Sequence, residues 1–158
     1  MVLAAAKKIK VTKLNTNKKI AIVHSLFNEK ICRSLVKAAK ATLLNNHINK
    51  NKIKVYAVPG AFEIPLVVKR VLETGQFDGV IALGCIIRGD TPHFEYVSKA
   101  VTDGCLRVQL DTNCPVTFGI LTVDNQIQAD VRSADNDFNK GREAALALLK
   151  TLITLERV

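Results

Sequence analysis

The segment Gly84–Val97, with the sequence GCIIRGDTPHFEYV, gathers residues whose types and spacing could do chemistry. A flexible glycine, a hydroxyl, a helix-starting proline and a titratable histidine occur close together as Gly89, Thr91, Pro92 and His93. An apolar run leads into this segment and helical spacing begins at His93, so we expect a strand-to-helix turn. Such a turn offers free backbone N–H groups and the positive end of a helix, which suits an anionic group.

The elements that must position this turn alternate along the chain. We expect strands at 19–23, 53–58, 79–84 and 115–121, and helices at 28–44, 62–72, 93–108, 126–133 and 140–155. A strand followed by a helix four times, with short connections, indicates a parallel sheet with helices on both faces. Because crossovers are right-handed, few topologies remain, and the simplest is a flavodoxin-like three-layer sandwich. We therefore predict an α/β fold with a four-stranded parallel sheet.

The N-terminal arm carries most of the positive charge. The net charge of this 158-residue chain is +9, and residues 1–19 contribute +6 of it from lysines without any acid. We predict a partly disordered basic arm at 1–18 and one domain at 19–158. Apolar Ile9, Val11 and Leu14 leave open that the arm adds a strand to a neighbouring subunit's sheet. The arm lacks aromatic residues that could stack on bases, so we expect no specific nucleic-acid binding.

The four cysteines and the hydropathy pattern limit the class of protein. Cys32, Cys85, Cys105 and Cys114 lack CxxC spacing and a histidine pairing suited to zinc, so we expect reduced, mostly buried thiols and no metal. A nucleophilic Cys85 is not expected, since His93 is the only base near it. No apolar run approaches the ~18 residues of a membrane span, and the start is too short for a signal peptide. A cytoplasmic protein is the expectation.

Residues suited to binding follow the expected strands. Phe27 comes after the first strand, and Phe62 and Glu63 come after the second. Phe118 lies late in the fourth strand, with Arg132 and Lys140 downstream. Because ligands of parallel sheets bind beyond the carboxyl ends of the strands, we expect these segments to converge on one edge. Aromatic rings, a carboxylate and cations together suit a flat polar ring beside a phosphate.

Three motifs carry a family resemblance: VPGAFEIP at 58–65, GCIIRGDTPHFEYV at 84–97 and FGILT at 118–122. With Phe27-Asn28 and Asn139-Lys140-Gly141, in matching order from about Ile20 to Leu152, they resemble the 6,7-dimethyl-8-ribityllumazine synthase family. The resemblance implies a transferase for the penultimate step of riboflavin biosynthesis. It implies condensation of 5-amino-6-(D-ribitylamino)uracil with 3,4-dihydroxy-2-butanone 4-phosphate, with loss of phosphate and water and without a cofactor.

The resemblance assigns one group of residues to the pyrimidine and its ribityl chain: Phe27, Ala61, Phe62, Glu63, Cys85, Ile86, Ile87 and Phe118. Phe27 is similar to the ring that stacks on the pyrimidine, and Phe118 to one that lines its pocket. Glu63, with its two neighbours, matches the segment that holds the ribityl hydroxyls. The segment that begins at Cys85 matches the backbone that reads the uracil edge. Taken singly, the aromatic residues are better explained as core, and Glu63 could be a first-turn acid that favours its helix dipole.

The resemblance also implies which residues bind the phosphate of the second substrate. Asp90 and Thr91 match the phosphate-contacting pair, Arg132 matches its charged clamp, and Lys140 is similar to a residue near the substrates. His93 matches the proton-transfer residue. Since an acid beside a phosphate would repel it, we expect the Asp90 side chain to point away. By itself Arg132 could be a surface charge, and we assign Arg88 to structure or to a subunit contact.

The resemblance also implies assembly. We expect a homopentamer whose active sites lie between subunits, with Phe118, Arg132 and His93 on the neighbour's side or at the rim. Assembly of the pentamers into a 60-subunit shell is left undecided, because residues 134–138 (Ala-Asp-Asn-Asp-Phe) replace the family's glycine-containing stretch. Riboflavin synthase is a possible partner. The alternatives are a non-catalytic flavin or lumazine carrier on the same fold, and a polyanion-binding scaffold that acts through the basic arm.

Overall fold

Four parallel strands form the centre of the molecule. The computed structural model describes residues 15–158, so the strand pattern at Ile9–Leu14 lies outside the described residues. The strands are β1 (Ile20–Ser25), β2 (Ile53–Val58), β3 (Gly79–Ile87) and β4 (Val116–Val123). They form one sheet in the order β2-β1-β3-β4, with every neighbouring pair parallel.

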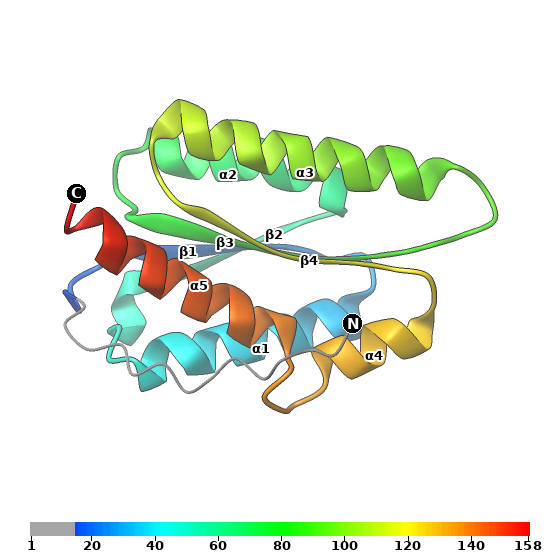
Figure 1. Ribbon diagram of the computed structural model, residues 1–158, viewed down its shortest axis with the longest axis horizontal. Helices are drawn as coiled ribbons and strands as arrows, with labels where there is room; N and C mark the ends of the chain where they lie inside the picture. The colour runs from blue at the N-terminus through cyan, green and yellow to red at the C-terminus, as the bar shows by residue number, and fades with distance from the viewer. Residues whose placement is uncertain (1–14) are drawn as a thin grey trace.

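Helices cover both faces of this sheet (Figure 1). They are α1 (Glu29–Asn45), α2 (Ile64–Glu73), α3 (His93–Thr112), α4 (Gln126–Ser133) and α5 (Lys140–Leu155), with short 3-10 turns at Lys50–Lys52 and Ala61–Glu63. Helices α2 and α3 lie on one face, and α1, α4 and α5 lie on the other (Figure 1). The predicted α/β three-layer sandwich with a four-stranded parallel sheet is confirmed. No helix within residues 15–158 combines the length and the apolar character that crossing a membrane requires.

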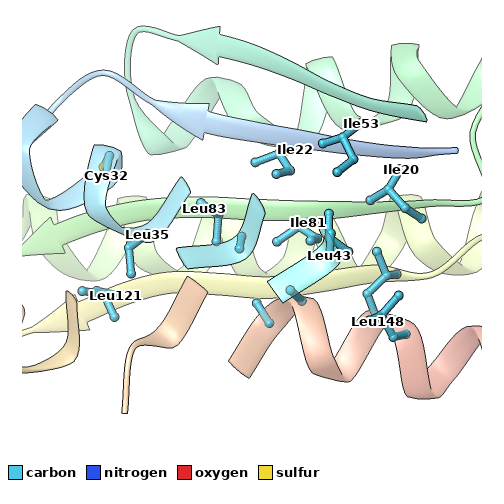
Figure 2. Close-up of a cluster of buried hydrophobic side chains, with 14 of the residues drawn as sticks. Ile20, Ile22, Cys32, Leu35, Leu43, Ile53, Ile81, Leu83, Leu121 and Leu148 are labelled. Atoms are coloured by element: carbon cyan, nitrogen blue, oxygen red, sulfur yellow. The ribbon is translucent and has the colours of Figure 1, made fainter. Parts of the chain in front are cut away.

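Each face of the sheet has its own apolar core, because successive side chains of a strand point to opposite faces. In β1, Ile20 and Ile22 pack with α1 and α5, whereas Ala21 and Val23 pack with α2 and α3. Figure 2 shows the first core, in which Leu148 of α5 lies near side chains of the strands and of α1. The two cores hold the strands in register and so fix the positions of their carboxyl ends.

The third strand is longer than predicted. It continues to Ile87, three residues past the expected end at Gly84, because β4 pairs with it as far as Ile87 and Val123. The motif residues Cys85, Ile86 and Ile87 therefore belong to the strand and not to the turn. Local sequence cannot reveal this extension, since the backbone partner comes from a distant segment.

Candidate active site

A cavity of about 680 Å³ opens where β1, β2 and β3 end. Most of the predicted site residues line it: Phe27, Ala61, Phe62, Glu63, Cys85, Ile86, Ile87, Thr91 and His93. They come from the ends of three strands and from the turn that leads into α3. The topology therefore brings these distant segments together, as expected for the carboxyl edge of a parallel sheet.

The backbone of Phe27 is held in place, while its aromatic ring stays exposed to solvent. Its N–H donates to the carbonyl of Pro59 at 3.0 Å, and the ring remains 72% exposed. The next residue, Asn28, adopts a left-handed conformation with φ 58°. Its side-chain Nδ2 donates to the backbone oxygen of Cys85 at 2.9 Å instead of capping α1. Asn28 thus ties the Phe27 loop to β3.

Glu63 has a structural contact as well as a place in the cavity wall. Its Oε2 accepts a hydrogen bond from the N–H of Gly60 at 2.9 Å, which closes the turn before α2. The neighbouring Phe62 ring is 62% exposed. Glu63 therefore closes this turn, and the same side chain lines the cavity.

The turn after β3 presents Thr91 and His93 to the cavity. Both residues are exposed, and an added Cβ at Gly89 would meet no atom within 4 Å. Asp90 is exposed and is not among the residues that line the cavity. That its carboxylate points away from a bound phosphate stays a prediction.

Three residues of α3 share one helix face at this cavity. Tyr96 and Val97 line it together with His93, at helix spacings i+3 and i+4. Phe94 also belongs to its wall. Sequence reasoning did not name Tyr96, Val97 or Phe94 as site residues. The helical spacing from His93 was the signal that could have found the first two.

The remaining cationic and aromatic residues line a second, smaller hollow beside β4. Phe118, Arg132 and Lys140 border this groove of about 180 Å³. Arg132 donates from Nη1 to the backbone oxygen of Gln128 at 3.0 Å, within α4. Lys140 Nζ lies 2.5 Å from Glu143 Oε2, so its charge is paired inside α5.

The start of α5 is fixed beside this groove by Asn139. Its side-chain oxygen accepts from the N–H of Gly141 at 2.9 Å, and its Nδ2 donates to the carbonyls of Ser133 and Ala134. Asn139 therefore closes the loop between α4 and α5. This contact explains the local role of the Asn-Lys-Gly motif.

Within one chain, the expected convergence on one edge of the sheet is not complete, because Phe118, Arg132 and Lys140 border the groove and not the cavity. Phe118 pairs in register with Ala82, in the middle of β3, so it does not lie at a carboxyl strand end. Its strand, β4, is also an edge strand of the sheet. His93 lines the cavity with Phe27, so within one chain it does not group with Phe118 and Arg132.

Burial keeps the cysteine thiols protonated. It raises the pKa of Cys85 to about 12, with smaller contributions from Cys32 and Asp130, and it raises the pKa of Cys105 to about 12. Cys85 is thus a poor nucleophile at neutral pH. Among residues 15–158, no group of three or more His, Cys, Asp or Glu side chains is arranged to hold a metal ion.

Comparison with known proteins gives the family. The family model described as 6,7-dimethyl-8-ribityllumazine synthase matches residues 17–156. The chain belongs to this lumazine synthase family. A curated relative, the 6,7-dimethyl-8-ribityllumazine synthase of Leuconostoc mesenteroides subsp. mesenteroides, is 42% identical over 143 residues, which cover 90% of this chain and 92% of the relative. The motifs that resemble the lumazine synthase family thus surround the cavity and the groove described above.

Proposed function

We propose that this lumazine synthase family member condenses 5-amino-6-(D-ribitylamino)uracil with 3,4-dihydroxy-2-butanone 4-phosphate. The product is 6,7-dimethyl-8-ribityllumazine, with release of phosphate and water, in the penultimate step of riboflavin biosynthesis. One observation carries this proposal: exposed aromatic rings line the same cavity as Thr91 and His93, which lie at the start of a helix. A flat ring and an anion can be held there side by side.

The pyrimidine binds against Phe27. Phe27 is 72% exposed at the cavity, so a flat ligand that stacks on its ring buries apolar surface. Burial of this surface and the stacking contact both favour binding. The backbone of Cys85, Ile86 and Ile87 reads the uracil edge. Ala61, Phe62 and Glu63 hold the ribityl chain, and the Glu63 carboxylate accepts hydrogen bonds from its hydroxyls.

The phosphate binds at the start of α3. Thr91 offers a hydroxyl, Asp90 contributes its backbone, and the positive end of a 20-residue helix favours an anion there. Arg132 and Lys140 supply cations from the groove of a second copy, where Phe118 closes the pyrimidine pocket. A guanidinium is well suited to bidentate contact with phosphate oxygens.

His93 transfers protons during the reaction. The substrate amine itself forms the imine, so a catalytic lysine is not required. Imine formation, phosphate elimination and ring closure each move protons near neutral pH, for which an imidazole is best suited. The remaining catalysis comes from holding two substrates in reacting positions.

The complete site needs two subunits, because one chain separates the cavity from the Phe118, Arg132 and Lys140 groove. We propose a homopentamer in the cytoplasm in which the groove of one subunit completes the cavity of the next. Exposed apolar side chains on α2 and α3, such as Leu66 and Leu110, support burial against a neighbour. Riboflavin synthase is the proposed partner for the product.

Product formation tests the function directly. Purified protein is mixed with both substrates, and lumazine absorbance and fluorescence are followed against the uncatalysed reaction. Acceleration is the expected result. A protein that binds lumazine tightly without accelerating its formation is instead the carrier, and the enzyme proposal is then wrong.

A further inference from the structure

Arg88 connects the end of β3 to the end of β4. Its backbone N–H donates to the carbonyl of Val123 at 2.9 Å, which extends the pairing of the two strands one residue beyond Ile87. Its side-chain Nε donates to Oδ1 of Asp124 at 3.0 Å. Asp124 directly precedes Asn125, the N-cap residue of α4, the helix that carries Arg132. Arg88 therefore joins the end of β3 to the segment that leads from β4 into α4.

The same guanidinium also holds the first turn of α3. Its Nη1 donates to Oε1 of Glu95, and its central carbon lies 4.2 Å from the ring centroid of Phe94. Hydrogen bonds to Glu95 and Asp124 raise the pKa of Arg88, and the bond from Arg88 lowers the pKa of Glu95. A planar guanidinium can serve two carboxylates and one ring at the same time, whereas an ammonium group cannot reproduce this fork.

The loop between Arg88 and α3 has few other contacts. Within residues 15–158, no hydrogen bond involves Gly89, Asp90 or Thr91, and all three are exposed. An added Cβ at Gly89 would meet open space. The position of the loop is thus set at its two ends, and Arg88 fixes both of them. Thr91 and His93 lie between or directly beside these ends.

We propose that Arg88 is a positioning residue for the condensation, which holds the loop and the first turn of α3 so that Thr91 and His93 face the cavity. Arg88 does not line the cavity itself, so it acts through its neighbours and not on the substrate. This inference rests on the proposed function. It gives the contacts of Arg88 with Asp124, Glu95 and Phe94 a part in the reaction, beyond the structural role that the sequence predicts for Arg88.

Steady-state kinetics of Arg88→Met test the proposal. Methionine keeps an apolar stem against Phe94 and removes both hydrogen bonds to carboxylates. We expect kcat to fall about tenfold to a hundredfold, because a shift of about 1 Å in a reacting group has an effect of this size. KM for the phosphate substrate should rise, while KM for the pyrimidine should not change, since Phe27 and Glu63 keep their contacts. Arg88→Lys should recover only part of the loss.

A matched control and a double variant separate positioning from general stability. Arg33 lies on α1 and pairs with Glu29 at 2.7 Å on an exposed surface, so Arg33→Met should behave as wild type. Glu95→Gln should lower kcat less than Arg88→Met does. The double variant Arg88→Met with Glu95→Gln should be no slower than Arg88→Met alone, because both act on one contact.

The outcomes are distinct. Wild-type kcat and both KM values in a folded Arg88→Met variant would overturn the inference, as would effects of Arg88→Met and Glu95→Gln that multiply. If Arg88→Met does not fold, Glu95→Gln and Asp124→Asn carry the test, and wild-type kinetics in both would overturn it. If wild-type protein forms no lumazine, the proposed function itself fails.

Discussion

At the scale of single residues, His93 and the buried thiols differ in how far solvent reaches them. His93 is exposed at the cavity, in the first turn of α3, where a proton can enter and leave. Cys85 and Cys105 are 2% and 3% exposed. The histidine is thus available for acid–base chemistry, whereas the thiols serve as apolar side chains of the core.

Replacing His93 with alanine should slow the reaction without abolishing it. A general acid–base contributes about 10²–10⁴-fold, and the positioning of the two substrates is retained. Turnover with both substrates at saturation measures the effect. His47→Asn is the control, because His47 is exposed after α1 and does not line the cavity, and asparagine tolerates its φ of 65°. A folded His93→Ala variant without turnover above the uncatalysed rate would show that His93 does more than transfer protons.

The buried thiols should make the folded protein less stable at alkaline pH. Burial raises the pKa of Cys85 and Cys105 to about 12 and that of Cys114 to about 11. Unfolded cysteines release their protons at about pH 8.5, so the folded state binds more protons above this pH. The free energy of unfolding should therefore fall as pH rises from about 9 toward 12.

Urea unfolding under reducing conditions at several alkaline pH values measures this decline. Cys105→Val removes one buried thiol and keeps an apolar side chain of similar size, so its decline should be shallower than that of wild type. An identical pH dependence for the two proteins would mean that Cys105 does not contribute.

At the scale of elements, α5 lies very close to α1. An added Cβ at Gly141 would be 2.1 Å from the backbone oxygen of Leu35, too close for any side chain. Leu35 and Leu43 of α1 and Leu148 of α5 also belong to the same core on this face of the sheet (Figure 2). Gly141, the last residue of the Asn-Lys-Gly motif, thus permits the approach of the two helices.

Gly141→Ala should strongly destabilise the protein. Helix propensity alone would favour alanine by about 1 kcal/mol, but the backbone of Leu35 cannot shift as a flexible side chain can. We expect the free energy of unfolding to fall by about 3 kcal/mol, measured by urea unfolding at one protein concentration. Gly89→Ala, where an added Cβ meets no atom within 4 Å, is the stability control. Equal stability of the two variants would contradict the close approach of the helices.

At the scale of the whole molecule, the separation of the cavity from the groove predicts complementation between subunits. One variant combines Phe27→Ala with His93→Ala and damages the cavity; the other combines Phe118→Ala with Arg132→Ala and damages the groove. In mixed oligomers, some sites pair an intact cavity with an intact groove from the neighbour. About a quarter of wild-type activity is expected from random mixing in equal amounts.

Co-expression with two different affinity tags isolates the mixed oligomers for the assay. Each variant assembled alone is the control and should be much less active. Mixed oligomers no more active than the average of the two separate variants would mean that each chain forms its own complete site.

The sequence by itself determined the fold class and most of the cavity wall. Alternating strand and helix periods predicted the parallel sheet and the strand ends that Phe27, Glu63, Thr91 and His93 follow. Both predictions were possible because these sequence patterns are local. Tertiary structure alone decided the extension of β3 to Ile87 and the placement of Phe118 beside Ala82, away from the cavity. It also decided the contacts of Arg88. Strand register and ion pairs join segments far apart in the chain, and their geometry is set only when the two cores pack.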